Sequence, residues 1–142
     1  MFGLFDSKTK KLVKKWEHEH EHLVELAGKI INNYAKHDEE QAKKELAELS
    51  DLASSHFMDE DLNFYKLTRD GKFDAETTQK VKEFTESFKK VKIDLMSFFA
   101  NYSRPEVPLD DDFFRHFNDI VEAVAKRIEF EEGDLYKNMA AK

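Results

Sequence analysis

The sequence predicts an all-α fold, an antiparallel up-down-up-down four-helix bundle that forms a single domain over residues 1–142. Apolar residues recur at alternating steps of three and four in four long segments, which is the spacing of a helix with one buried face. The chain holds only four glycines and two prolines, so little interrupts these segments. The four expected helices cover residues 7–36, 38–69, 74–103 and 110–140.

The first helix, 7–36, is expected to turn one of its histidines toward the core. Its apolar face consists of Val13, Trp16, Leu23, Ala27, Ile30 and Tyr34. His20 falls in the gap of this series, about 40° around the helix axis from Trp16, whereas His18 lies about 200° away from Trp16. We therefore expect His20 to face inward, and His18 and His22 to face mostly outward.

The second helix, 38–69, carries a polar pair in the middle of its apolar face. Asp38 and Gln41 form a capping-box pattern at its start, and Gly71 suits its C-terminal stop. The apolar face consists of Ala42, Leu49, Leu52, Ala53, Phe64 and Leu67. His56 and Glu60 interrupt this face one helical turn apart, so both side chains point the same way. A histidine and a carboxylate in this arrangement are a candidate pair of metal ligands.

The third helix, 74–103, has the most regular pattern in the chain. Asp74 is its expected N-cap. Its apolar face consists of Val81, Phe84, Phe88, Val91, Leu95, Phe98 and Tyr102. We interpret this aromatic stripe as core packing rather than as a cofactor site.

The fourth helix, 110–140, follows the one clear linker of the chain. Pro105 and Pro108 end the third helix, because proline restricts the residue before it and donates no hydrogen bond. The acidic run 110–112 suits a helix N-terminus electrostatically. The inward face consists of Phe113, Phe117, Ile120, Val124, Ile128, Glu131 and Leu135. Arg127 lies on the shoulder of this face.

The two halves of the chain resemble each other as two helical hairpins. Their alignment pairs His56 with Arg127, Glu60 with Glu131, Tyr65 with Tyr136 and His20 with Phe88. The first hairpin thus keeps the candidate metal ligands, and the second keeps only a carboxylate.

The inward polar residues of the first, second and fourth helices are expected to meet in one layer, because antiparallel helices bring their middles together. These residues are His20, His56, Glu60, Arg127 and Glu131. Two buried carboxylates without a positive partner would be strongly unfavourable. A metal ion can supply that charge, since iron, manganese and zinc all accept imidazole and carboxylate ligands. Arg127 is the alternative source.

Charge and composition exclude several classes of function. The formal net charge of −7 disfavours nucleic-acid binding and suits a soluble protein or one with a basic partner. The chain has no cysteine and no apolar run near the roughly 20 residues of a membrane span, so we expect a cytoplasmic protein. The apolar segment Met1–Phe5 is expected to pack on the end of the bundle. No nucleophile with a neighbouring base and no phosphate-binding loop is evident, so we interpret the protein as a non-enzyme.

Several of these residues carry a resemblance to the hemerythrin-like HHE cation-binding family. The matching motifs are Glu19-His20 followed by Leu23 and Leu26, His56-x-x-x-Glu60-Asp61 with Phe64-Tyr65, and Arg127-x-x-x-Glu131-Glu132 with Leu135-Tyr136. The resemblance implies an antiparallel four-helix bundle that holds two non-haem irons, for reversible dioxygen binding or for oxygen and iron sensing.

The resemblance also implies roles for single residues. The first iron would be held by His20, His56 and Glu60, and the carboxylate of Glu131 would bridge toward it. The second iron requires histidines where this chain has Phe88 and Arg127. This departure speaks against a two-iron centre and dioxygen carriage. It leaves two alternatives: one metal ion with Arg127 in place of the other, or a metal-free core in which Arg127 bridges the two glutamates.

A second resemblance is to the Rsd/AlgQ regulators of RNA-polymerase sigma factors. It rests on Leu12-Val13-Lys14-Lys15-Trp16-x-His18-x-x-x-His22-Leu23, on Ser55-His56-Phe57 and on Lys126-Arg127-Ile128 with Glu131-Glu132. It implies a protein-binding regulator whose partner is a basic sigma-factor region. In that case His18 and His22 would belong to a contact surface.

Overall fold

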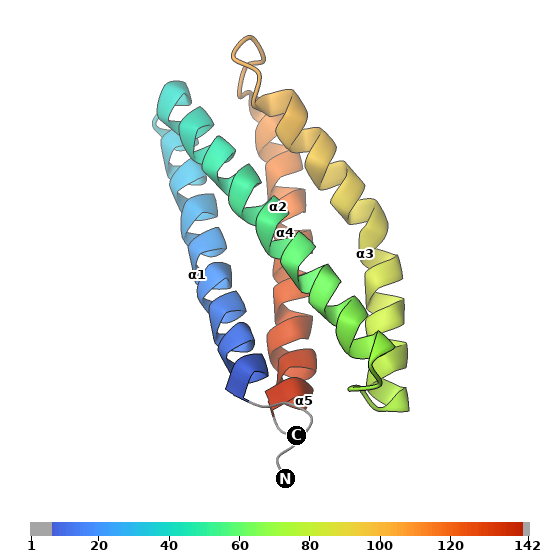
Figure 1. Ribbon diagram of the computed structural model, residues 1–142. Helices are drawn as coiled ribbons and strands as arrows, with labels where there is room; N and C mark the ends of the chain where they lie inside the picture. The colour runs from blue at the N-terminus through green and yellow to red at the C-terminus, as the bar shows by residue number, and fades with distance from the viewer. Residues whose placement is uncertain (1–6, 141–142) are drawn as a thin grey trace.

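The computed structural model describes residues 7–140 and has the expected up-down-up-down arrangement (Figure 1). Its elements are α1 (Ser7–Ala35), α2 (Glu39–Arg69), α3 (Ala75–Tyr102), α4 (Asp111–Phe130), a π-helical segment η1 (Glu131–Leu135) and α5 (Tyr136–Ala140). α1 begins and α5 ends at the same end of the bundle, and the linker between α3 and α4 lies at the other end. The four-helix fold that the sequence predicts is confirmed. The expected packing of Met1–Phe5 lies outside the described residues.

Aspartates determine where three of the helices begin. Asp38, Asp74 and Asp110 each accept a hydrogen bond from the backbone N–H three residues further on, at 2.7–3.2 Å. Each bond satisfies an N–H group that has no partner within the helix, and each negative charge lies at the positive end of the helix dipole. After α2, Gly71 adopts a φ of 68°, a left-handed conformation that glycine accepts without steric strain.

The last helix departs from the expected uninterrupted stretch 110–140. At Glu131 the α-helix widens into a π-turn, in which the N–H of Tyr136 donates to the carbonyl of Glu131, five residues earlier. This segment includes Gly133. The extra residue in the turn changes which side chains face the core, and Tyr136 turns inward as a consequence.

The polar layer separates two apolar clusters. The larger one fills the bundle toward the α3–α4 linker and includes Leu26, Ile30, Leu46, Leu95, Phe98, Phe113 and Phe117. The smaller one lies at the end where α1 begins and includes Val13, Trp16, Phe64, Val81, Leu135, Tyr136 and Met139. Burial of these side chains is the main source of stability. None of the helices in the described part of the chain is long and apolar enough to cross a membrane.

Candidate metal centre

Four of the residues singled out by the sequence meet in the core. His20 comes from α1, His56 and Glu60 come from α2, and Glu131 comes from η1. Each of these residues is at most 2% exposed. One ligand atom from each residue can be chosen such that all four lie within 4.8 Å of one another. The convergence expected from the helical spacing is therefore present.

The two imidazole rings are held with the same nitrogen facing inward. Nδ1 of His20 lies 2.7 Å from Glu132 Oε2, and Nδ1 of His56 lies 2.7 Å from Glu19 Oε1. Because an ionised carboxylate only accepts hydrogen bonds, each ring carries a proton on Nδ1. In the neutral ring, Nε2 then presents a lone pair. The two Nε2 atoms lie 3.0 Å apart.

Carboxylate oxygens complete the same small space. Glu60 Oε1 lies 3.0 Å from Nε2 of His56, and Glu131 Oε1 lies 3.2 Å from Nε2 of His20. Neighbouring donors in a shell with metal–ligand bonds of about 2.1 Å lie about 3 Å apart. Two imidazole lone pairs and two carboxylates at this spacing fit one cation. A carboxylate on Nδ1 of each ring is also the usual way in which a metal-binding histidine is oriented.

Arg127 forms the other half of the layer and is 2% exposed. Its Nε donates to Glu131 Oε2 at 3.1 Å, and its Nη2 donates to Glu60 Oε1 at 3.3 Å and to Asp61 Oδ1 at 2.9 Å. The guanidinium carbon lies 4.5 Å from the ring centres of both Phe57 and Phe88. Arg127 therefore bridges the two buried glutamates, as one reading of the sequence requires.

Tyr136 is a further member of the layer. Its hydroxyl donates a short hydrogen bond to Glu60 Oε2 and lies 3.4 Å from both Glu131 Oε1 and His20 Nε2. The tyrosine ring stacks on His20 with centroids 5.8 Å apart. Tyr136 thus restrains a histidine and both carboxylates of the site.

Comparison with known proteins identifies the family of the chain. A model of the hemerythrin HHE cation-binding domain matches residues 11–139, nearly the whole chain. The chain belongs to the hemerythrin HHE cation-binding family. Searches of curated proteins and of solved structures gave no significant match.

The HHE resemblance implies a centre with two irons. The residues of this chain do not provide a site for the second one. Phe88 is buried and packs its ring against the guanidinium of Arg127, so neither position offers a ligand. Arg127 already bonds to both carboxylates that would face a second ion. The residues present therefore suit one cation beside a fixed guanidinium.

The buried charges of this HHE site shift the proton affinities of its members. Burial alone would lower the pKa of His20, but Glu131 and Glu132 outweigh it and raise the pKa above its ordinary value. The pKa of His56 is raised in the same way, mainly by Glu60. Burial raises the pKa of Glu131, whereas the contact of Glu60 with His56 outweighs burial and lowers the pKa of Glu60. The core thus attracts positive charge, either protons or a metal ion.

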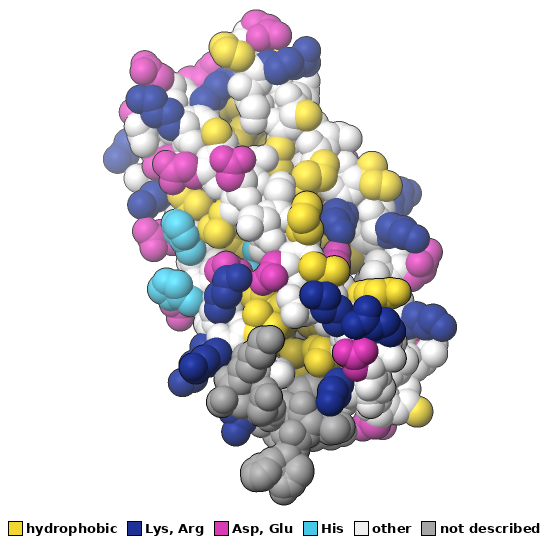
Figure 2. Space-filling model, viewed as in Figure 1, with side chains coloured by type: hydrophobic (Ala, Val, Ile, Leu, Met, Phe, Trp, Pro, Cys, Tyr) yellow, Lys and Arg dark blue, Asp and Glu magenta, His cyan; other side chains and the backbone are white. Residues whose placement is uncertain are grey.

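The outward histidines lie where the sequence places them. His18 and His22 are both exposed, and His18 Nδ1 lies 3.8 Å from the carboxylate of Glu21. Histidine side chains are visible at the surface on the α1 side of the molecule (Figure 2). Neither His18 nor His22 belongs to the buried cluster.

Sequence reasoning missed the residues that support the ligands. Glu19 and Glu132, each next to a predicted ligand, position the two rings, and Tyr136 bonds to Glu60. Their adjacency in Glu19-His20 and Glu131-Glu132 was the available signal. The repeat pairs Tyr136 with Tyr65, but Tyr65 is 64% exposed, so the two tyrosines have different roles.

Proposed function

We propose that the protein binds a single non-haem transition-metal ion through Nε2 of His20 and His56 and the carboxylates of Glu60 and Glu131. One observation carries this proposal: the two Nε2 atoms lie 3.0 Å apart while Nδ1 of each ring faces a carboxylate. If both rings are neutral, two lone pairs directed at each other in a buried space are favourable only with a cation between them.

The balance of charge supports one ion beside Arg127. With both imidazoles neutral, the layer holds two fully buried carboxylates and one buried guanidinium. Arg127 compensates one negative charge and leaves the other for a metal ion. Arg127 also donates to Asp61, so the glutamates are not its only partners. Asp61 in turn accepts a hydrogen bond from Lys92 at 2.5 Å.

Iron is the metal that we propose first, and manganese and zinc are alternatives with the same ligand preference. An iron ion held there supplies reversible one-electron chemistry. The donor residues are at most 2% exposed, which suits an ion held in the core better than a substrate. We therefore propose a sensing or regulatory role for the protein rather than an enzymatic one.

A second candidate function is supported by the contacts of Arg127. Because this side chain already bonds to Glu60 and Glu131, the layer can be compensated without metal if one histidine is protonated. In that case the protein is a metal-free regulator that binds a basic protein partner, as the Rsd/AlgQ resemblance suggests. His18 and His22 would then be part of the contact surface.

Metal content separates the two candidates. We expect the protein purified without chelators, or reloaded anaerobically with iron, to hold one metal ion per chain by elemental analysis. A double variant, His56→Ala with Glu60→Ala, removes two of the four donors and should lose the ion. The matched control is the pair His18→Ala and His22→Ala, which removes two histidines from the exposed face of α1.

The control pair should keep the full metal content of the parent. Substoichiometric metal in the parent after loading with iron, manganese or zinc would favour the metal-free regulator. Two ions per chain would contradict the role given to Arg127.

A further inference from the structure

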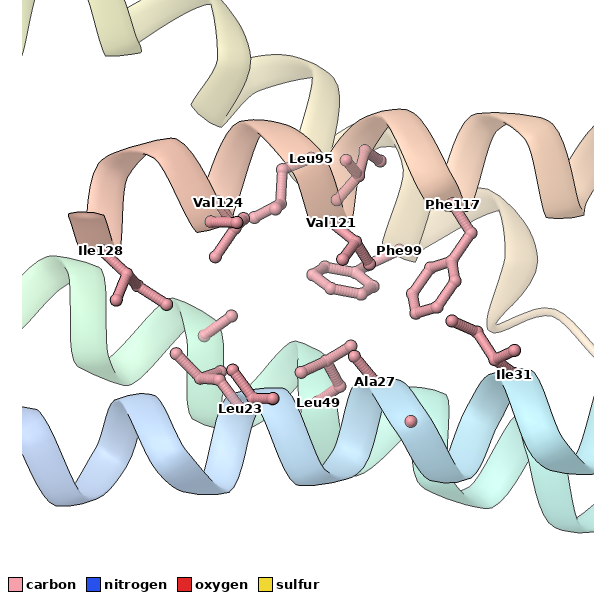
Figure 3. A pocket seen from close by; sticks show the side chains of 15 residues that line it. Leu23, Ala27, Ile31, Leu49, Leu95, Phe99, Phe117, Val121, Val124 and Ile128 are labelled. Carbon is pink, nitrogen blue, oxygen red and sulfur yellow. The ribbon is translucent and has the colours of Figure 1, made fainter. Parts of the chain in front are cut away.

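A hollow of about 270 Å³ lies between α1 and α4, on the side of the layer that faces the larger apolar cluster. Figure 3 shows Leu23, Ala27 and Ile31 of α1 facing Val121, Val124 and Ile128 of α4 across this space. Side chains of α2 and α3 close its floor. The two helices are thus held apart over several turns in the middle of a well-packed bundle.

The lining of this hollow has one chemical character. All fifteen lining residues are glycine, alanine, valine, leucine, isoleucine or phenylalanine, so no lining side chain can donate or accept a hydrogen bond. Water needs two to four polar partners to occupy a cavity, whereas an apolar cavity of about 150 Å³ stays dry and binds benzene. We propose that the hollow is a binding site for an uncharged, apolar small molecule, of the size of a two-ring aromatic or a short acyl chain.

The size and lining of the hollow indicate a small molecule as its occupant. Its volume of about 270 Å³ is close to the lower end of the roughly 300–1,000 Å³ of ligand pockets. An uncharged molecule suits it, because a charged group would be buried there without a polar partner.

The mouth of the hollow lies along α1. Val24 lines it and is 64% exposed, and Gly28, one turn further, is also exposed. A Cβ atom built on Gly28 would meet no other atom within 4 Å. A Cβ atom at position 28 therefore displaces no neighbour, and a residue other than glycine would favour the helix there.

The hollow also approaches the metal centre. Leu23 lies one turn after His20 on α1, and Ile128 lies one turn before Glu131. None of the four candidate ligands lines the hollow. Binding of an apolar molecule can therefore be measured on chelator-treated protein, without an ion in the layer.

Two fluorescent probes with the same skeleton test the proposal. 1-Naphthylamine is uncharged at neutral pH, and 8-amino-1-naphthalenesulfonate adds a sulfonate to the same two rings. The uncharged probe should bind one per chain with a dissociation constant in the range of about 1–100 µM. The sulfonate should bind at least about tenfold more weakly, because a charge buried without a partner is unfavourable.

Gly28→Leu should weaken binding of the uncharged probe at least about tenfold while the melting temperature stays the same or rises. The control, Ala100→Leu, adds a similar side chain on the exposed face of α3 and should leave binding unchanged. Methyl resonances of Leu23, Val121 and Ile128 should shift with the probe, and those of Leu67 should not. Absent binding to the parent, equal binding to Gly28→Leu, or probe-induced shifts confined to residues outside the hollow would overturn the proposal.

Discussion

His20 and His56 direct their Nε2 atoms at each other across 3.0 Å, and a carboxylate on Nδ1 fixes each ring in that orientation. The two histidines come from different helices, α1 and α2, so the packing of these helices determines their distance. The supporting carboxylates, Glu19 and Glu132, lie in α1 and η1. Contacts from three elements therefore hold the two rings in this orientation.

Removing one supporting carboxylate should weaken metal binding without unfolding the protein. We expect Glu19→Gln and Glu132→Gln each to reduce metal affinity about 10–100-fold, since the amide no longer fixes the protonation of Nδ1. Competition titrations against a chelator measure the change. Glu21→Gln, an exposed change on α1, is the control and should have the affinity of the parent. If both test variants bind metal as tightly as the parent, Glu19 and Glu132 do not orient the histidines for metal binding.

Arg127→Leu should destabilise the metal-free protein by about 3–5 kcal/mol, because Glu60 and Glu131 would remain buried without a counter-charge. Urea unfolding at a pH of about 8 measures the loss. Arg115→Leu removes an exposed arginine from the same helix and should change stability by less than about 0.5 kcal/mol. A loss below about 1 kcal/mol for Arg127→Leu would show that the guanidinium does not compensate the glutamates.

Tyr136→Phe should destabilise the metal-free protein by about 1–3 kcal/mol, because the buried Glu60 loses a hydrogen-bond donor. The repeat supplies a matched control in Tyr65, which is exposed. Tyr65→Phe should cost less than about 0.5 kcal/mol. If urea unfolding shows the same loss of stability for both changes, the hydroxyl of Tyr136 does not stabilise the buried Glu60.

Stability of the metal-free protein should fall as the pH rises above 6.5, the ordinary pKa of histidine. The pKa values of His20 and His56 are raised in the folded state, so their stabilising protonation is complete below 6.5 and is lost through the folded-state pKa. The raised pKa of Glu131 acts in the same direction. Metal affinity should show the opposite dependence and increase with pH, because protons compete for the ligands.

Urea unfolding of chelator-treated protein between about pH 6 and about pH 9 checks this prediction. His18→Ala, which changes an exposed histidine, should show the pH dependence of the parent. A metal-free protein that becomes more stable over this range would mean that the buried histidines are not held in their protonated form.

The helical pattern was sufficient to predict the fold and the inward direction of His20, His56, Glu60 and Glu131. His20 could be recognised as buried because it fills the gap between Trp16 and Leu23, and His56 and Glu60 because they interrupt an apolar face. In each case the regular geometry of an α-helix converts sequence spacing into direction.

Features that depend on irregular backbone or on the separation of helices could not be predicted in this way. In an α-helix, Tyr136 would point about 140° away from Glu131, and only the π-turn brings the two side chains to the same face. The apolar hollow arises because α1 and α4 are held apart, which no pattern within either helix records. Glu19 and Glu132 contact Nδ1 of His56 and His20, which lie on other helices. These contacts depend on how each imidazole ring is rotated, which the sequence does not record.

Anomalous diffraction at the iron edge, on crystals of protein loaded with ferrous iron under anaerobic conditions, would locate the ion. We expect one anomalous peak per chain, bonded to Nε2 of His20 and His56 and to the carboxylates of Glu60 and Glu131. Arg127 should remain on the other side of the two glutamates without contacting the ion. A second peak beside Phe88, or no peak within the layer, would contradict a site for one ion beside Arg127.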